Sequence, residues 1–243
     1  MPDRSPTELE GVLLVDKPPE WTSHDVVAKC RRIFGIRKIG HAGTLDPMAT
    51  GLLVVLIGKG ATKASQFLIS LDKAYEGTIY LGRVTDSQDA DGEILEEREV
   101  APFPLTEIEN TFEKFIGDQY QIPPMFSAKK VQGVPLYKMA RKGQEIEREP
   151  RFIRVESLDL LSYQHPEITF SCAVSKGTYV RTLAHDIGQI LGSGATLTSL
   201  RRTRIDSLEV SRAYTIDALT ALPPSQLGRV LIPIHKVVPS HVL

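Results

Sequence analysis

The sequence from Gly40 to Gly51 reads GHAGTLDPMATG, and it leads directly into LLVVLI, the apolar run from Leu52 to Ile57. A short apolar run of this kind, bounded by glycine and proline, predicts a buried central strand. Pro47 biases Asp46 away from helical backbone angles, and the glycines permit turns and close approaches. The stretch therefore predicts a rigid loop that presents the Asp46 carboxylate as a nucleophile or general base. The alternative, from these residues alone, is an Asp-Pro turn without a chemical role.

A strand and a helix are predicted just before this loop. Residues 11–15 have the character of a short buried strand, which the prolines at positions 18 and 19 would end. A helix is expected to start near Thr22 or Ser23, because the apolar positions up to Phe34 recur with the period of an α-helix. Gly35 then stands where a left-handed residue commonly ends a helix.

Alternation and helical periodicity predict further elements downstream of the loop. The expected strands cover about 75–81, 153–160, 168–174 and 196–200, with a partner strand near Ile94 and a hairpin at Gln132-Gly133. The expected helices cover about 61–69, about 178–191, and a segment that ends near Ile116 and starts at a capping box of Thr106 and Glu109. Strands and helices do not alternate regularly, so we expect an α+β fold with a mixed, largely antiparallel central sheet flanked by helices and loops.

The composition is that of an ordinary globular protein: of 243 residues, 42% are hydrophobic and 24% are charged. A chain of this length can bury one large core or two small ones. The sequence shows neither a secretion signal nor an apolar run long enough to cross a bilayer, so we expect a soluble cytoplasmic protein. Cys30 and Cys172 are too few for a disulfide framework and lack zinc-ligand spacing, so both are interpreted as core thiols.

The net charge of −1 conceals a segregated charge distribution. Acidic residues crowd the segment from Asp86 to Glu99. Basic residues gather in three clusters: Lys29, Arg31, Arg32, Arg37 and Lys38; Lys129, Lys130, Lys138, Arg141 and Lys142; and Arg201, Arg202 and Arg204. Such local basic surfaces would attract a phosphate backbone, although solvated protein faces are the alternative explanation.

Two other patterns suggest different chemistry. Asp89-Ala90-Asp91-Gly92 resembles part of a calcium loop, but Arg98 stands where a calcium loop in this register needs a bidentate glutamate. Ser127 and Lys130 fit the Ser-x-x-Lys pattern of serine acylases, whose other motifs are absent. The sequence therefore predicts no metal site, and a serine acylase is a rival hypothesis.

Three separated blocks resemble the TruB family of pseudouridine synthases, in the order that the family has them. The blocks are Leu13 to Pro18 with Trp21-Thr22-Ser23 after it, the loop from Gly40 to Gly51, and Ser175 to Leu183 joined by Leu200-Arg201-Arg202. Weaker matches, among them Thr85 to Gly92, fill the gaps, so the likeness covers roughly Gly11 to Pro239. The resemblance implies the pseudouridine synthase fold and the isomerisation of a uridine in the T loop of tRNA, at position 55 of standard tRNA numbering.

The resemblance also implies three catalytic residues. Asp46 would be the nucleophile, and Arg181 would keep the Asp46 carboxylate ionised and hold it with a bidentate fork. Tyr75 would stack on the target base and help to remove the C5 proton. No cofactor is implied, because the isomerisation involves no redox change and consumes no energy source.

The expected substrate contacts come from the same resemblance. His41 would fill the place of the flipped base, Tyr179 and Leu200 would line the substrate pocket, and Lys17 and Pro18 would pack beneath the catalytic loop. The substrate-binding set also includes Gly43 of the loop and Lys129, Lys130 and Arg141 of a basic segment at about 120–151. That segment resembles the family's thumb, and its phosphate contacts would supply affinity more than specificity.

We expect a single catalytic domain over residues 1–243, with the thumb-like segment inserted and without the C-terminal PUA domain of longer bacterial relatives. The expected partner is the T arm of tRNA, the default oligomeric state is a monomer, and no membrane is involved. The rival hypothesis from another class is a tRNA-binding or tRNA-folding protein whose modifying activity is secondary or lost. The basic segments alone would satisfy that hypothesis.

Overall fold

The apolar run after the glycine-rich loop forms strand β3 (Thr50–Ile57), and all of its residues except Thr50 are buried. The computed structural model describes residues 9–127, 130–131, 133–140, 144 and 146–239. Strand β1 (Gly11–Lys17) pairs antiparallel with β3 along its whole length. The prediction of a buried strand directly after the loop is therefore confirmed.

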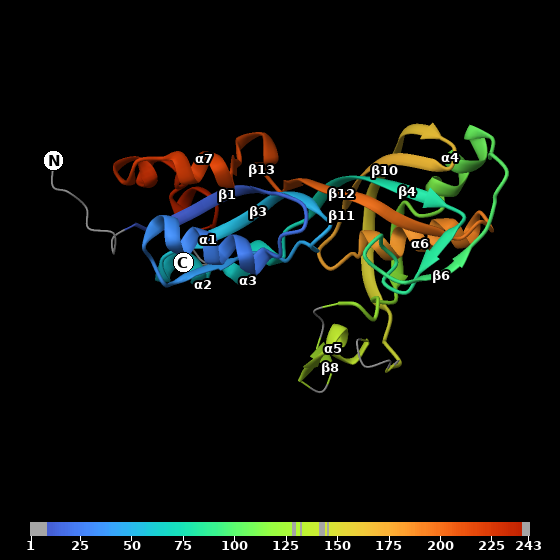
Figure 1. Cartoon of the computed structure of the whole chain (residues 1–243), viewed down its shortest axis with the longest axis horizontal. Helices are drawn as coiled ribbons and strands as arrows, with labels where there is room; N and C mark the ends of the chain where they lie inside the picture. The colour runs from blue at the N-terminus through green and yellow to red at the C-terminus, as the bar shows by residue number, and fades with distance from the viewer. Residues whose placement is uncertain (1–8, 128–129, 132, 141–143, 145, 240–243) are drawn as a thin grey trace. The chain divides into compact units, whose positions relative to one another are not determined.

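The chain divides into two compact units. Unit 1 contains residues 1–75 and 201–243, and unit 2 contains residues 76–200. The division falls inside two long strands, β4 (Lys73–Leu81) and β12 (Ala195–Ile205), which are labelled in Figure 1. The expectation of a single catalytic domain over the whole chain stays a prediction.

Strand β3 has partners along both of its edges in unit 1. Strand β1 occupies one edge. On the other edge, β2 (Ile39–His41) pairs antiparallel with the last residues of β3, and β12 pairs parallel with the first ones, with Arg202 opposite Gly51. The glycine-rich loop joins β2 to β3, so both of its ends are fixed in one sheet.

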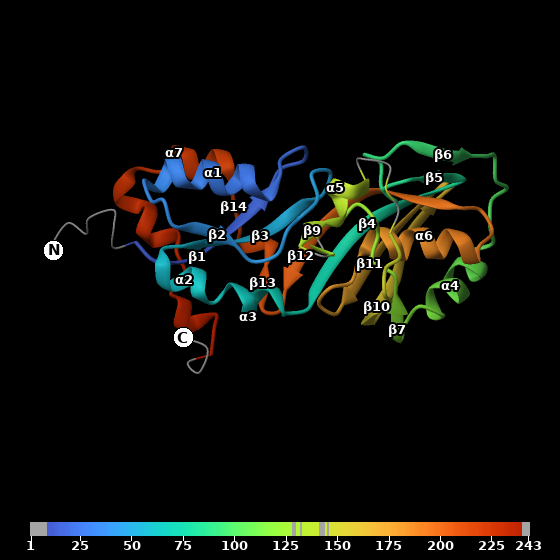
Figure 2. The same cartoon turned by 90° about the horizontal axis from the view of Figure 1, so that it is seen from below.

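Helices cover both faces of the sheet in unit 1 (Figure 2). Helices α1 (Ser23–Phe34) and α7 (Ile216–Ala221) lie on one face, whereas α2 (Lys59–Lys63) and α3 (Ser65–Ile69) lie on the other. A hydrophobic cluster under α2 and α3 joins side chains of β1 and β3 to Leu68. The remaining elements of unit 1 are β13 (Leu208–Glu209), β14 (Tyr214–Thr215) and the 3-10 helices η2 (Val210–Arg212), η3 (Pro224–Val230) and η4 (Ile234–Lys236).

Helix α1 begins and ends where the sequence predicts. Thr22 is the N-cap and forms a capping box with Asp25, because each side chain accepts a hydrogen bond from the other residue's backbone N–H. Gly35 ends the helix with a left-handed φ of 66°. The helix buries Val26, Val27 and Cys30 on one side, as the helical period of its apolar residues requires.

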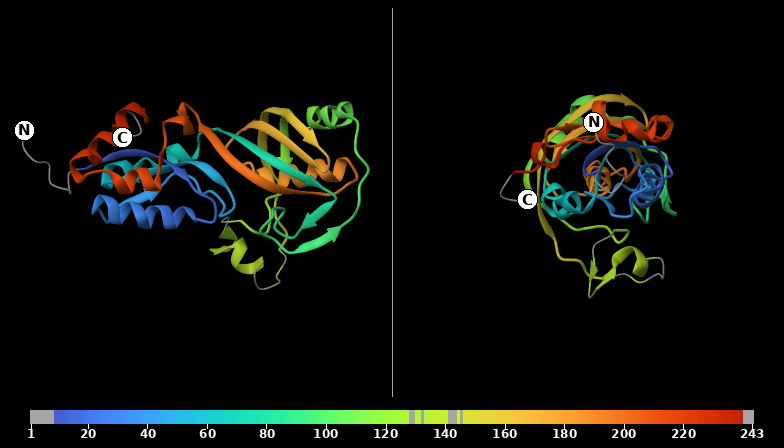
Figure 3. Two further views of the ribbon diagram at one scale, coloured as in Figure 1. Left: turned by 45° about the horizontal axis from the view of Figure 1, so that its top comes forward. Right: turned by 90° about the vertical axis from the view of Figure 1, so that its left-hand side faces the viewer.

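Unit 2 is built on a largely antiparallel sheet whose long hairpin is visible in Figure 3. The hairpin strands, β10 (Arg151–Gln164) and β11 (Glu167–Val174), lie between β4 and the edge strand β7 (Gly117–Gln121). Helix α4 (Leu105–Glu113) contacts both β10 and α6 (Val180–Ile190). The unit also contains β5 (Arg83–Thr85), β6 (Ile94–Glu97), β8 (Lys130–Val131), β9 (Val134–Pro135) and α5 (Leu136–Ala140), together with most of β4 and the first part of β12. The prediction of an α+β fold with a mixed, largely antiparallel sheet is confirmed.

Three local predictions need correction. The strand near Ile94 exists, but its partner is β5 and not β4. The helix expected over 61–69 is interrupted at Ala64, which separates α2 from α3. The capping box at Thr106 is wrong, because α4 already starts at Leu105 after the N-cap Pro104, whose carbonyl accepts hydrogen bonds from the amides of residues 107 and 108.

Predictions about the cysteines and the hairpin are tested directly. Cys30 and Cys172 are both buried, as expected of core thiols. The hairpin strands β8 and β9 pair around the predicted turn, with Val131 opposite Val134, although Gln132 lies outside the described residues. In the described part of the chain, no helix combines the length and the apolar character that are needed to span a bilayer.

Candidate active site

The glycine-rich loop of unit 1 is closed at both ends by backbone pairing. At its start, the Ala42 amide donates to the carbonyl of Val54 at 2.9 Å. At its end, Gly51 has a φ of 95° and lies opposite Arg202 of β12. A Cβ atom at position 51 would lie 2.3 Å from the Arg202 carbonyl oxygen, so only glycine allows this close approach.

The backbone on both sides of Asp46 is held by hydrogen bonds. The Ser23 hydroxyl accepts from the Leu45 amide at 2.9 Å and donates to the Leu45 carbonyl at 3.2 Å. The Asp46 carbonyl accepts from the Ala49 amide at 3.1 Å, which closes a turn at Pro47. Ser23 is buried whereas Asp46 is partly exposed, so the loop presents its carboxylate from a fixed backbone.

Lys17 lies beneath this loop and is fully buried. Its ammonium group donates to the carbonyls of Pro18, Trp21 and Pro47 at 2.9, 2.6 and 3.1 Å. The Pro47 carbonyl also accepts from the Glu20 amide at 2.9 Å. A buried ammonium needs such acceptors, and these tie the chain around Pro18 to the residue that follows Asp46.

Arg202 enters the loop from β12 and is 1% exposed. Its Nε donates to the Leu52 carbonyl at 2.7 Å, and its two terminal nitrogens donate to the carbonyls of Thr44 and Gly43 at 3.3 and 3.2 Å. The guanidinium therefore contacts the loop before and after Asp46. Sequence reasoning placed Arg202 in a basic cluster and missed this role, because a basic run does not reveal which of its members is buried.

His41 ends β2 at the entrance of the loop. Its ring makes an edge-to-face contact with the ring of His24, with 5.5 Å between the centroids. Burial lowers the pKa of His41, and electrostatic interactions with His24 and Arg202 lower it further. The lowered pKa therefore favours the neutral form of the His41 ring at pH 7.

Tyr75 is the last residue of unit 1 and points inward from β4, where it is 8% exposed. Its burial alternates with that of its neighbours along the strand, as the sequence predicts. Unit 1 thus contains Asp46, Tyr75, His41, Gly43, Lys17 and Pro18 of the predicted site. The other described members of the predicted site belong to unit 2.

Arg181 lies in the first turn of α6 in unit 2 and is 5% exposed. It forms an ion pair of 2.9 Å with Asp89, and the same nitrogen donates to the Ser87 carbonyl at 3.1 Å. Its other terminal nitrogen donates to the Phe126 carbonyl at 2.8 Å. These bonds fix the plane of the guanidinium. The predicted partnership of Arg181 with Asp46 stays a prediction.

Asp89 is a buried carboxylate that the sequence analysis did not place in the site. Its Oδ1 accepts from the Ser87 hydroxyl at 2.5 Å and from the Asp91 amide at 3.2 Å, while its Oδ2 binds Arg181. The segment that carries Asp89 is also bound to α6, because the Thr182 hydroxyl donates to the Gln88 side chain at 2.7 Å. The signal that could have found Asp89 was the family match from Thr85 to Gly92.

Tyr179 precedes α6 and is held by a buried glutamine. The Tyr179 amide donates to Gln121 Oε1 at 2.8 Å, and Gln121 Nε2 donates back to the Tyr179 carbonyl at 3.1 Å. Leu200, on β12, is 8% exposed. Tyr179 therefore lies two residues before Arg181 in the sequence, and Gln121 of β7 holds the Tyr179 backbone in place.

The structure describes the predicted basic segment only in part. Lys129 and Arg141 lie outside the described residues, and for Lys130 the structure describes only the backbone in β8. Ser127, the nucleophile of the rival acylase hypothesis, is 4% exposed. Within the described part of the chain, no group of three or more His, Cys, Asp or Glu side chains could hold a metal ion.

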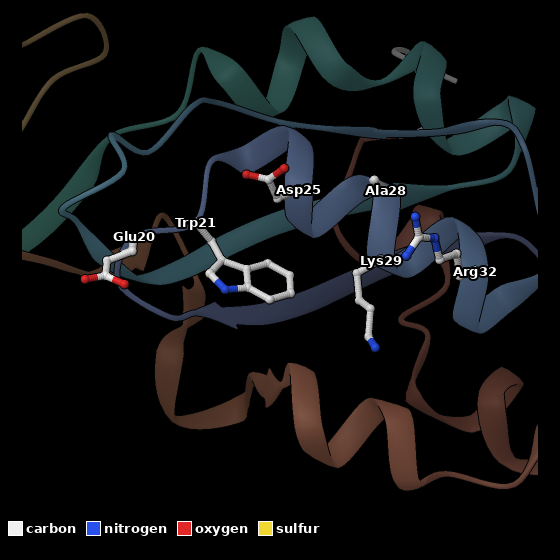
Figure 4. A pocket seen from close by; sticks show the side chains of 6 residues that line it. All are labelled: Glu20, Trp21, Asp25, Ala28, Lys29 and Arg32. Carbon is white, nitrogen blue, oxygen red and sulfur yellow. The ribbon is translucent and has the colours of Figure 1, made fainter.

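A separate pocket of about 360 Å³ lies beside α1 in unit 1 (Figure 4). It is lined by Glu20, Trp21, Asp25, Ala28, Lys29 and Arg32, and the Trp21 ring lies between Glu20 and Lys29 in this view. No residue of the predicted site lines it. The pocket is therefore distinct from the loop that carries Asp46.

Comparison with known proteins gives consistent matches along the chain. A family model described as TruB family pseudouridylate synthase (N terminal domain) matches residues 31–180, and one described as tRNA pseudouridylate synthase B C-terminal domain matches residues 181–238. A protein of Opitutus terrae named tRNA pseudouridine synthase B is 60% identical over 235 residues, which are 97% of each chain. One of the same name from Syntrophotalea carbinolica is 46% identical over 94% of this chain and 74% of its own.

A solved structure extends the likeness to the fold. A chain in the crystal structure of a Cbf5-Nop10-Gar1 complex superposes with a TM-score of 0.74 at 28% identity. The match covers 97% of the present chain but only 64% of that chain, so the present chain spans less than two thirds of this neighbour.

Proposed function

The chain belongs to the TruB family of pseudouridylate synthases, and from this premise we propose that it converts a uridine of tRNA into pseudouridine, with Asp46 as the nucleophile. We place the target uridine in the T loop, at position 55 of standard tRNA numbering. The observation that carries the proposal is the loop itself. It resembles the family's catalytic loop from Gly40 to Gly51, and hydrogen bonds fix the backbone on both sides of Asp46 while leaving the residue partly exposed.

The reaction is an isomerisation, so the product has the atoms of the substrate. The bond between N1 of uracil and C1′ of the ribose breaks, the base turns, and C5 bonds to C1′. The proton on C5 is lost and N1 gains one, so neither an oxidant nor water is consumed. Attack of Asp46 on the sugar, its attack on the base, and deprotonation of the ribose by Asp46 all require an ionised carboxylate.

We assign Arg181 to the Asp46 carboxylate on the strength of the family resemblance. A guanidinium favours the ionised form of a carboxylate and orients it with two parallel hydrogen bonds. The contacts of Arg181 within unit 2 suit this role. Asp89 and two carbonyls hold the side chain, so the direction of its fork does not depend on the substrate.

The remaining assignments concern the flipped base and the RNA. Tyr75 is proposed to stack on the target uracil and help remove the C5 proton, and Tyr179 and Leu200 are proposed to line its pocket. The neutral ring of His41 is proposed to fill the space that the base leaves, since base extrusion costs a few kcal/mol. Lys129, Lys130 and Arg141 are proposed to contact phosphates of the T arm. Gly43 is proposed to belong to the substrate-binding part of the loop, and Lys17 and Pro18 to pack beneath that loop.

The proposal is tested by Asp46→Asn, with Asp217→Asn as the matched control. Asp217 lies exposed in the first turn of α7. Unmodified tRNA is incubated with each protein, and pseudouridine is mapped position by position. We expect Asp46→Asn to lower the rate by about 10³-fold or more while the affinity for the T arm stays close to that of the wild type.

Each outcome of this experiment has a clear meaning. Pseudouridine at the T-loop position with wild-type protein, lost in Asp46→Asn and kept in Asp217→Asn, supports the proposal. Retained turnover in Asp46→Asn refutes the assignment of the nucleophile. Tight tRNA binding by the wild type without any pseudouridine would favour the rival hypothesis of a tRNA-binding or tRNA-folding protein.

A further inference from the structure

We propose that Arg202 is a positioning residue that clamps the two ends of the loop carrying Asp46 and so holds that carboxylate in its reactive place. The inference deepens the proposed function and rests on it, because it takes Asp46 as the reacting group. Arg202 does not touch the carboxylate in any contact that the structure describes. Its effect would be exerted through the backbone of the loop.

The side chain of Arg202 binds the loop on both sides of Asp46. Two bonds reach the carbonyls of Gly43 and Thr44, which precede Asp46, at 3.2 and 3.3 Å. The third and shortest, of 2.7 Å, reaches the carbonyl of Leu52, after the loop has entered β3. One planar group therefore sets the separation of two backbone segments that are far apart along the loop.

The backbone of Arg202 reaches the same loop by a second route. Arg202 is the register partner of Gly51 in the parallel pairing of β12 with β3. The approach is so close that a Cβ atom at position 51 would lie 2.3 Å from the Arg202 carbonyl oxygen and 2.9 Å from its amide nitrogen. The end of the loop is thus pressed against the residue whose side chain holds its start.

Burial of this cation argues against a role in packing alone. Arg202 is 1% exposed, and within the described residues its hydrogen bonds go to the neutral backbone carbonyls of the loop and of β3. Burying a charge without a carboxylate partner is costly, and an apolar side chain would fill the same volume without that cost. An apolar side chain has no hydrogen-bond donors. The guanidinium has several donors in fixed directions, and these bind carbonyls on both sides of Asp46.

The neighbouring arginines of β12 show that this role is specific to position 202. Arg201 is 40% exposed in its side chain and forms a bidentate ion pair with Asp16. Arg204 is exposed and donates to the carbonyl of Asp206 in the turn that follows the strand. Of the three arginines, only Arg202 is buried against the carbonyls of the loop.

The test compares Arg202→Lys with the control Arg204→Lys. Lysine keeps the charge but cannot reach several carbonyls with one planar fork. We expect Arg202→Lys to lower kcat on T-arm RNA by about 10²-fold, the size expected when a reacting group is displaced by about 1 Å. The Kd for RNA should stay within about threefold, and amides of residues 42–50 should exchange faster with deuterium.

A second variant protects the test against misfolding. Arg202→Gln removes the buried charge, keeps two donors, and is expected to raise the pKa of His41 because a nearby positive charge is lost. All proteins are assayed well below their own melting temperatures. Arg204→Lys should match the wild type in every measurement.

Several results would overturn the inference. One is a kcat within threefold of the wild type in either folded Arg202 variant; another is unchanged deuterium exchange in residues 42–50. If neither variant folds, Arg202 builds the unit rather than positions the loop, and the inference also fails. The proposed function fails separately, when wild-type protein makes no pseudouridine, and the exchange measurement would still decide whether Arg202 clamps the loop.

Discussion

At the scale of single residues, the position of Asp46 depends on the side chain of Ser23, which holds the preceding residue. Its hydroxyl satisfies both the amide and the carbonyl of Leu45. Ser23→Ala would leave two polar groups beside a buried side chain without these partners, at an expected loss of about 1–3 kcal/mol in the free energy of unfolding. We also expect a lower kcat, because the residue before Asp46 would be released.

Urea denaturation and single-turnover kinetics check this prediction for Ser23. The control is Ser207→Ala, at an exposed position in the turn after β12, for which we expect a change within about 0.5 kcal/mol. Equal stability and equal kcat of Ser23→Ala and the wild type would contradict the proposed anchoring.

The pH dependence at the residue scale comes from His41. Burial, His24 and Arg202 lower its pKa, so between that pKa and about 6.5 the unfolded chain binds a proton that the folded chain does not. The free energy of unfolding therefore falls as the pH is lowered through this range. His41→Gln removes this contribution, so denaturation series at pH 5 to 7 should show a shallower pH dependence for the variant, and an identical dependence would contradict the assignment.

At the scale of elements, the junction of the loop with β3 depends on Gly51. Its positive φ is a conformation that other residues rarely adopt. The closeness of the Arg202 backbone also leaves no room for a side chain. Gly51→Ala is expected to cost more than about 3 kcal/mol, because strain in the backbone adds to a steric clash. The matched control is Gly133→Ala, since Gly133 also has a positive φ, and none of the atoms that the structure describes lies within 4 Å of its Cβ position. Thermal unfolding of both variants separates the effect of the clash from that of the strain.

Elements with a strong local signal could be predicted from the sequence. Helix α1 has both an apolar period and caps at Thr22 and Gly35, and β3 has an apolar run between turn residues. Thr106 was misread as a cap because a capping-box spacing does not exclude an earlier start: Pro104 is the N-cap, and its carbonyl accepts from the amides of residues 107 and 108. The partner of β6 could not be predicted, since strand pairing depends on contacts that alternation along one strand does not encode.

The candidate site was predictable where the loop sequence is itself the signal. Asp46 follows from its Gly-rich, Pro-restricted setting together with the family resemblance. Asp89 and Arg202 were missed because both appeared to belong to charged surface clusters. Their burial comes from long-range contacts, such as those of Asp89 with Arg181, which no local pattern reports.

At the scale of the whole molecule, charge distribution matters more than net charge. The chain carries a net charge of −1 but gathers its basic residues in clusters. If about four phosphates of the T arm are neutralised, raising the salt concentration from about 50 to 200 mM should weaken binding by about 10²-fold. Filter binding or fluorescence anisotropy over a salt series measures the slope, and an affinity that does not change with salt would contradict phosphate contacts.

The division of the chain into two units has a consequence for folding during synthesis on the ribosome. Unit 1 is made from two stretches that flank unit 2, and its strand β1 pairs with β14 while Val12 bridges to Ile232. The nascent chain therefore emerges with apolar strands whose final neighbours have not yet been translated, and the continuous segment 76–200 has the first opportunity to fold. Arg202 is translated more than 150 residues after Gly51, at the start of the returning stretch. A truncated chain that ends before Arg202 would lack the side chain that binds the loop around Asp46. We therefore expect such a partial translation product to be catalytically inactive.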